Sequence, residues 1–205
     1  MDGGRSAGVV NTRRCLAASL LVILASGCAA VTTRQKSAPK LWAGLERGDS
    51  KVGFRTAGQV SVWYPAASGG EVLHFGDYAG AHDDLEKSLR AKHFSDQMIA
   101  GLFGTRMFAR RDAVAVENKV PVAMIVLKDG ESAADHAVLA EFIASHGYVV
   151  GAAPAKANID AVQGGRPSLF LHNLDVTTWT FVLTPADAKQ KAEKILAFVE
   201  AHFTR

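Results

Sequence analysis

The most regular pattern of apolar and polar residues lies in the second half of the chain. Residues 120–127, VPVAMIVL, are almost uninterruptedly apolar, as expected of a strand buried on both faces of a parallel sheet. Residues 134–146 carry apolar side chains at helical spacing, and Gly147 supplies a left-handed stop. Residues 148–154, YVVGAAP, predict the next strand. Strand, helix and strand at this spacing indicate a right-handed crossover, and hence an α/β fold with a mostly parallel sheet flanked by helices.

A weaker pattern predicts further elements in the amino-terminal half. Residues 59–64, QVSVWY, alternate polar and apolar side chains and are rich in β-branched and aromatic types. They predict a strand, which Pro65 is expected to end. Residues 83–102 carry leucine, phenylalanine and methionine at roughly helical spacing, so one or two helices are expected there.

The carboxyl-terminal part ends in a helix with a well-marked start. Thr184 can cap this helix and Pro185 stands at the first helical position, so a helix over 185–203 is predicted. Its apolar face is expected to pack on the sheet. Before it, residues 168–174 (SLFLHNL) and 178–183 (TWTFVL) are two candidate strands.

The amino terminus has the pattern of an export signal. Two arginines precede the apolar run at 15–27, which has the length of a signal-peptide core and is too short to span a membrane comfortably. The run closes on LASGC, which is similar to a bacterial lipoprotein signal in which Cys28 becomes lipidated and forms the new amino terminus. An ordinary secretory signal and an uncleaved anchor remain the alternatives.

The predicted domain organisation follows from this signal. Residues 1–28 are interpreted as the signal peptide with its lipidation site, 29–40 as a flexible tether without apolar periodicity, and 41–205 as one domain. The expected location is the cell envelope, on the periplasmic or extracellular side of a bacterial membrane, anchored by a lipid at Cys28. If Cys15 is removed with the signal, the mature chain has no thiol for a disulfide, a metal or nucleophilic catalysis.

Charge and histidine placement exclude some classes of function. The formal net charge is +3, but lysines and arginines are scattered rather than gathered with aromatic residues into a stripe, so no nucleic-acid partner is expected. His82 beside Asp83 and Asp84 could suggest a metal site. Because no HExxH motif or second clustered histidine supports it, the two acids are interpreted as helix caps. No metal and no cofactor is predicted.

Several stretches of the chain together resemble one enzyme family. They are VGFRT followed by VWYPA (52–66), FGDY (75–78), and ARRDA leading into VPVAMIVLKDGESAADHAVLAEFIASHGYVV (109–150). They are similar to bacterial exported α/β-hydrolases of the dienelactone hydrolase and platelet-activating-factor acetylhydrolase type, over residues 52–154, about half of the chain. The resemblance implies a partial α/β-hydrolase-like fold in which 120–127 leads to the loop that supplies an oxyanion-hole amide.

The resemblance also implies acyl transfer to water by a serine, a histidine and an orienting acid. The serine of such enzymes lies in G-x-S-x-G, a strained turn between strand and helix. This chain has no such pentapeptide, and Ser132, Ser145 and Ser168 do not lie between two glycines at that spacing. After Pro154 only 51 residues remain of 205, which is too short for the elbow, its helix, two strands and a histidine loop.

Ser132 and His136 are the hydroxyl and imidazole nearest the region that borders the active site in a complete hydrolase. They are therefore weak catalytic candidates, together with Asp175, which follows a stretch similar to the late hydrolase strand that ends on the triad acid. Each has a structural alternative. Ser132 with Asp135 resembles a helix capping box, and Asp175 can be an ordinary loop residue.

Gly130 corresponds to the glycine of the oxyanion loop in the family. Its neighbour Asp129 would repel the negative charge that develops in an oxyanion hole, which argues against efficient hydrolysis. The two residues can alternatively form an ordinary turn.

Three interpretations of the function remain. The first is an active ester or lactone hydrolase with an unrecognised serine. The second is a non-enzymatic, lipid-tethered binding or scaffolding module that accepts a small ester-like or apolar ligand. The third is a truncated or internally deleted product with a poorly filled core. The missing elbow and the short remainder favour a hydrolase-like protein with impaired catalysis.

Overall fold

The computed structural model describes residues 41–42, 44–79, 83–117, 119–155 and 157–204. These residues belong to one compact unit, Lys36–Arg205. The predicted signal peptide, Cys28 and tether lie outside the described residues, and so does His82.

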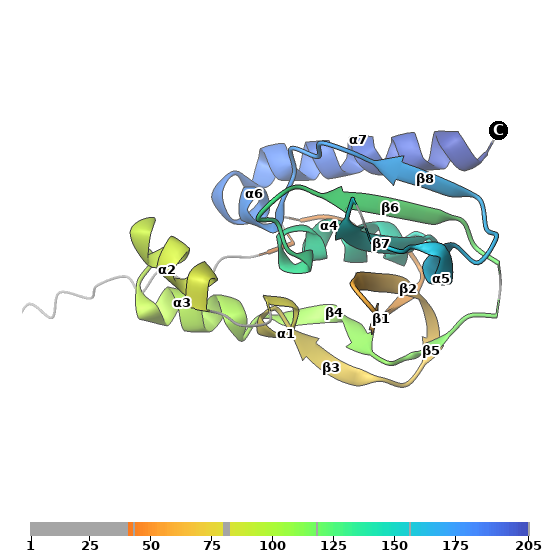
Figure 1. Ribbon diagram of the computed structural model, residues 1–205. Helices are drawn as coiled ribbons and strands as arrows, with labels where there is room; N and C mark the ends of the chain where they lie inside the picture. The colour runs from red at the N-terminus through yellow and green to blue at the C-terminus, as the bar shows by residue number, and fades with distance from the viewer. Residues whose placement is uncertain (1–40, 43, 80–82, 118, 156, 205) are drawn as a thin grey trace, which may run out of the picture. The chain divides into compact units, whose positions relative to one another are not determined.

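A mixed sheet with helices packed against it forms the described part of the chain (Figure 1). Its strands are β1 (Lys51–Ala57), β2 (Val60–Ser68), β3 (Glu71–His74), β4 (Arg106–Arg111), β5 (Val114–Ala115), β6 (Val122–Leu127), β7 (Val149–Pro154) and β8 (Ser168–Leu171). Its helices are α1 (Gly76–Ala79), α2 (Asp83–Ala91), α3 (Asp96–Phe103), α4 (Ala133–Ser145), α5 (Asp160–Gln163), α6 (Thr178–Leu183) and α7 (Pro185–Phe203).

The strand order is β3-β4-β1-β2-β7-β6-β8, with β5 paired to β2 off this path. β6 is parallel to both β7 and β8, and β1 is parallel to β4. The pairs β1–β2, β2–β7, β2–β5 and β3–β4 are antiparallel. It follows that β2 and β3 run in one direction and the other described strands in the opposite one. The predicted α/β class is confirmed at this level.

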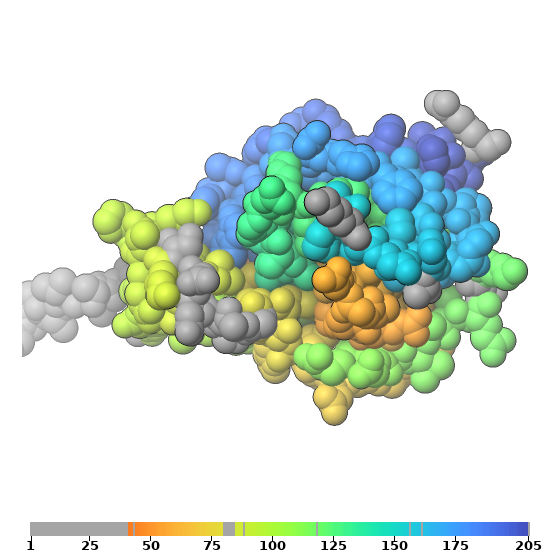
Figure 2. Space-filling model, viewed as in Figure 1, coloured from red at the N-terminus to blue at the C-terminus, as the bar shows by residue number. Residues whose placement is uncertain are grey.

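The alternation of side chains along β6 divides the core between the two faces of the sheet. Ala123 and Ile125 face a cluster that includes buried residues of α4, α6 and α7. Val122 and Met124 face a second cluster, which contains Val60 and Val62 of β2 and Val162 of α5. Figure 2 shows the orange surface of β2 and the cyan surface near α5 side by side, although they are far apart in the sequence.

The crossover unit predicted from the sequence is confirmed. β6, α4 and β7 follow one another, and β6 pairs with β7 in parallel register from Val122 opposite Val149 to Leu127 opposite Pro154. Gly147 has a φ of 95° and ends the helix as expected. The final helix also has the predicted bounds, 185–203.

Pro65 does not end the second strand, contrary to the prediction. It lies inside β2, opposite Val52 of β1. The pairing of β7 with β2 extends only from Ser61 to Trp63, so no β7 carbonyl needs an N–H group from Pro65. The missing donor is tolerated because the ladder with β7 has already ended, while the carbonyl oxygen of Pro65 still accepts a hydrogen bond from the amide of Val116 at 3.0 Å, next to the pairing of β2 with β5.

The prediction of a strand at 178–183 is wrong, because this segment is helix α6. The amide of Thr177 donates to Thr180 Oγ1 at 3.1 Å, and the amide of Thr180 donates back to Thr177 Oγ1 at 3.4 Å. Phe181 is buried in the main core cluster. Capping and burial therefore outweigh the preference of β-branched and aromatic residues for strands.

β6 lies near one edge of the sheet rather than at its centre. It is the last strand but one, because only β8 lies beyond it along the described order. A strand in this position is still buried on both faces and flanked on both sides, which explains its continuous apolar sequence.

Candidate functional site

The predicted site residues that the structure describes lie in the loops that follow β6 and β8, except His136, which lies in the first turn of α4. In open α/β sheets, ligands bind outside the carboxyl ends of the parallel strands. The ammonium group of Lys128, just after β6, donates a hydrogen bond to the carbonyl oxygen of Leu174 after β8, at 3.1 Å. The two loops are therefore in contact, and the chemistry of this edge can be judged from its hydrogen bonds.

Ser132 acts as the cap of α4. Its backbone amide and its hydroxyl both donate to Asp135 Oδ2, at 2.7 and 2.9 Å, and the predicted capping box is present. The second carboxylate oxygen of Asp135 accepts a hydrogen bond from Trp179 Nε1 at 2.6 Å. The Ser132 hydroxyl is exposed, but its partner is a carboxylate that also stabilises the helix start and holds α6. This arrangement provides no imidazole base for Ser132.

His136 is paired with a different acid. Its Nε2 lies 3.1 Å from Glu131 Oε2, and the side chain is only 1 % exposed. Burial raises the pKa of Glu131, but hydrogen bonds from the Lys128 amide and from His136 outweigh this effect and hold the pKa below its ordinary value. Glu131 is therefore a carboxylate that accepts the Nε2 proton.

The other ring nitrogen of His136 is enclosed in the protein. Nδ1 is buried and has no hydrogen-bond partner among the described residues. A general base must come within hydrogen-bond reach of the proton that it removes. In this structure neither nitrogen of His136 is open to a substrate, and the pair formed by Glu131 and His136 lies at the start of α4.

Gly130 lies in a tight turn. The amide of Glu131 donates to the carbonyl oxygen of Lys128 at 3.0 Å, and Gly130, the third residue of this turn, has a φ of 81°. Glycine favours that conformation because other residues strain there. The alternative of an ordinary turn at Asp129 and Gly130 is thus the one formed.

Asp175 forms ion pairs at the surface. Its Oδ2 lies 2.8 Å from Lys191 Nζ, and the same ammonium lies 3.1 Å from Asp187 Oδ2. The hydrogen bond from Lys191 lowers the pKa of Asp175 from its ordinary value. The hydrogen bonds of Ser132, His136 and Asp175 therefore go to three different partners, and these residues do not form a catalytic relay.

The turn after β8 contains a residue that the sequence analysis did not single out. Asn173 has a φ of 52° and is one of three residues other than glycine with a positive φ among those described. It is exposed and lies between β8 and α6. Asparagine is the residue type other than glycine that most readily adopts this conformation, so an asparagine directly after a short strand is the signal that could have identified the turn.

An apolar groove lies between β8 and α7. It has a volume of about 370 Å³ and is lined by Phe170, Leu171, His172, Leu174, Lys194, Ile195 and Phe198. Phe170 and Phe198 are 42 % and 57 % exposed. Periodicity did not predict it, because Phe198 lies outside the main apolar stripe of its helix and Phe170 projects from the last strand of the sheet.

The part of the chain that the structure describes offers neither a metal cluster nor a membrane-spanning helix. No group of three or more histidine, cysteine, aspartate or glutamate side chains is placed there to hold a metal ion. Among the same residues, no helix has the length and apolar composition required to cross a bilayer. No protein-family model matches the sequence, and no curated protein matches it.

Proposed function

We propose that this protein is an α/β-hydrolase-like domain that has lost serine-hydrolase catalysis and binds a small apolar or ester-like ligand, tethered to the cell envelope through a lipid at Cys28. The observation that carries the proposal is the turn after β8. In enzymes of this family the nucleophilic serine occupies a strained turn between a strand and a helix. Here the segment between β8 and α6 contains Asn173, which has a left-handed backbone, so we compare β8 with the strand before the nucleophile rather than with the late strand that ends on the triad acid.

An asparagine cannot take the role of that serine. The side chains that form covalent intermediates carry a hydroxyl, thiol, amine, carboxylate, imidazole or phenol group, and a carboxamide is none of these. The candidate base also argues against hydrolysis, since His136 is buried and paired with Glu131. Both observations support the loss of serine-hydrolase catalysis, while the crossover unit β6–α4–β7 supports descent from an α/β-hydrolase.

The groove between β8 and α7 supports the choice of ligand. Its volume of about 370 Å³ lies within the range of small-molecule sites, and most of its lining is apolar. Lys194 and His172 are its polar side chains, and both are exposed. The groove therefore suits an apolar chain that ends in an ester or a carboxylate, with the ammonium group of Lys194 as the partner of the head group. The buried residues on both faces of the sheet argue against the poorly filled core of a deletion product.

The test combines a catalytic and a binding measurement. A fluorophosphonate probe is expected not to label the protein, and a short-chain activated ester is expected not to be hydrolysed above background. A dansylated fatty acid is expected to bind with increased fluorescence, and the double variant Phe170→Ser/Phe198→Ser is expected to weaken this binding about tenfold through lost apolar contact.

Leu183→Ser is the matched control, because Leu183 is also a large apolar residue, 56 % exposed, and does not line the groove. Labelling that a single serine substitution abolishes would show an active enzyme and contradict the proposal. Equal binding by the double variant and the control would show that the groove is not the ligand site.

A further inference from the structure

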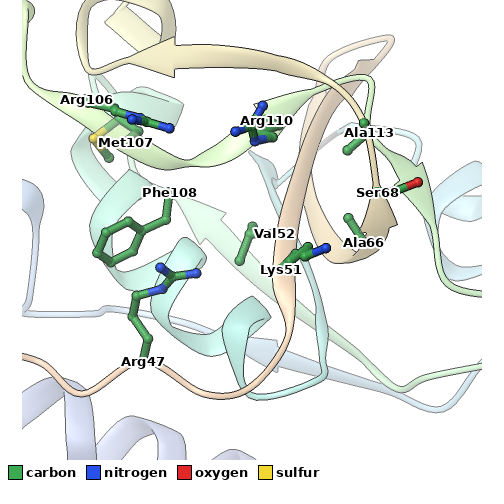
Figure 3. Close-up of a pocket in the computed structure, with 11 residues that line it drawn as sticks. Arg47, Lys51, Val52, Ala66, Ser68, Arg106, Met107, Phe108, Arg110 and Ala113 are labelled. Atoms are coloured by element: carbon green, nitrogen blue, oxygen red, sulfur yellow. The ribbon is translucent and has the colours of Figure 1, made fainter.

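A second cavity, which shares no lining residue with the groove, lies beside β1, β2 and β4. It has a volume of about 640 Å³. Its lining contains four cations and no carboxylate: Arg47, Lys51, Arg106 and Arg110. We call it the basic cavity. Figure 3 shows Arg106 and Arg110 on β4 and Arg47 on the segment before β1, arranged around Phe108 and Val52.

Among the described residues, none of the four cations of the basic cavity forms an ion pair with a carboxylate, although the charge of Arg47 acts on the buried Glu141. The ion pairs found among the described residues involve other lysines, arginines and histidines. Lys51 Nζ donates to the carbonyl oxygen of Ala67 at 3.3 Å, and Arg110 Nη1 donates to that of Gly70 at 3.2 Å. These neutral acceptors orient the two side chains and leave their charges uncompensated. Like charges around one cavity repel each other, so an anion between them is stabilised by all of them.

Arg47 is held in place by aromatic packing. Its guanidinium carbon lies 4.0 Å from the centre of the Phe108 ring. The ring of Trp42 is stacked on the same Phe108 ring, with the two ring centres 3.9 Å apart. A guanidinium stacked on an aromatic ring keeps its N–H groups free at the ring edge while losing part of its conformational freedom. The position of Arg47 is therefore fixed before any ligand arrives.

Apart from Ser68 and Gly69, the remaining lining of the cavity is apolar. Val52, Ala66, Met107 and Ala113 are buried, and Phe108 is half-buried. A ligand that fills the cavity must therefore combine anionic groups with an organic body. Guanidinium groups match phosphate oxygens through paired N–H donors, which makes phosphate the anion that an arginine-rich site recognises best. A cavity of this volume accepts a small molecule rather than a polymer backbone that runs along a stripe.

The geometry points to the basic cavity as a binding site for a small organic phosphate, independent of the groove between β8 and α7. The phosphate group would lie among Arg47, Lys51, Arg106 and Arg110, and the organic part would lie against Phe108 and Val52. The phosphate could belong to a soluble metabolite or to a phospholipid head group, because both present the same oxygens.

Titration calorimetry on the full chain tests this inference with two probes. Inorganic pyrophosphate represents a soluble phosphate, and monomeric dihexanoyl phosphatidylglycerol represents a phospholipid head group. Binding at one site per chain is expected for at least one probe, weakening as salt is added because the contacts are ionic. Arg106→Gln, Arg110→Gln and Lys51→Gln are each expected to weaken it about tenfold.

Lys92→Gln is the matched control for Lys51→Gln, since it removes one exposed positive charge that does not line the cavity. The substituted cavity cations are exposed, so these variants are expected to keep the melting temperature of the unaltered protein. Tighter binding of the lipid, with the same dependence on the cavity cations, would assign the site to a phospholipid head group. Absence of binding by both probes, or equal weakening by Lys92→Gln and Lys51→Gln, would overturn the inference.

Discussion

Replacement of Glu141 by glutamine is expected to change how the stability of this protein depends on pH. Glu141 lies in the middle of α4 and is completely buried. Its carboxyl group accepts hydrogen bonds from the Tyr78 hydroxyl at 2.5 Å and from the amides of Phe108 and Ala109 at 2.9 and 3.1 Å. The network joins α4 to α1 and to β4.

Burial raises the pKa of Glu141 from 4.5 to about 7, although the three hydrogen bonds and the charge of Arg47 oppose the rise. The folded protein therefore holds a proton on this group over a pH range in which the unfolded chain has released it. The contribution of Glu141 to the free energy of unfolding is fully present below pH 4.5 and is lost as the pH rises through about 7. From these two values, ionisation weakens folding by about 1 kcal/mol at pH 5 and by about 3 kcal/mol at pH 8.

Glutamine has nearly the shape of a protonated glutamate but does not ionise. In Glu141→Gln, the free energy of unfolding relative to the unaltered protein is expected to rise by about 2.5 kcal/mol between pH 5 and pH 8. Urea unfolding followed by tryptophan fluorescence measures this difference, because the buried Trp63 lies beside Tyr78, with ring centres 5.6 Å apart. Glu193→Gln, at an exposed position, is the control and is expected to show no such trend. A difference that stays constant within about 0.5 kcal/mol over this range would refute the reasoning.

Three further predictions concern the stability of the fold, each measured by chemical denaturation. Thr177→Ala is expected to destabilise the protein by about 1 kcal/mol through loss of the cap of α6. Phe181→Ala is expected to lower the free energy of unfolding by about 3–5 kcal/mol, because this ring is only 1 % exposed. Phe198→Ala, at a 57 % exposed position, is expected to change it by about 0.5 kcal/mol or less. Gly48→Ala is expected to cost about 2 kcal/mol or more, since its new methyl group would lie 2.2 Å from the backbone oxygen of Ser145; unchanged stability would contradict this close approach.

The sequence by itself determined the elements whose local signals agree with their surroundings. β6, α4 and β7 combine apolar runs, a capping serine and a stop glycine, so pattern and fold coincide there. The final helix was equally predictable from Thr184 and Pro185. The turn at Gly130 and the capping role of Ser132 were among the alternatives that the residues suggested, and both are formed.

Only the tertiary structure decided which secondary structure forms where local sequence preferences conflict, and which distant residues come into contact. The segment 178–183 has the composition of a strand, yet it is a helix because its cap and the burial of Phe181 outweigh local preference. The charged lining of the basic cavity comes from two stretches, around Arg47 and around Arg110, that are distant in the sequence. Local patterns report the conformation that a segment prefers, whereas burial, partner choice and cavity lining depend on contacts between distant segments, and these contacts exist only in the folded chain.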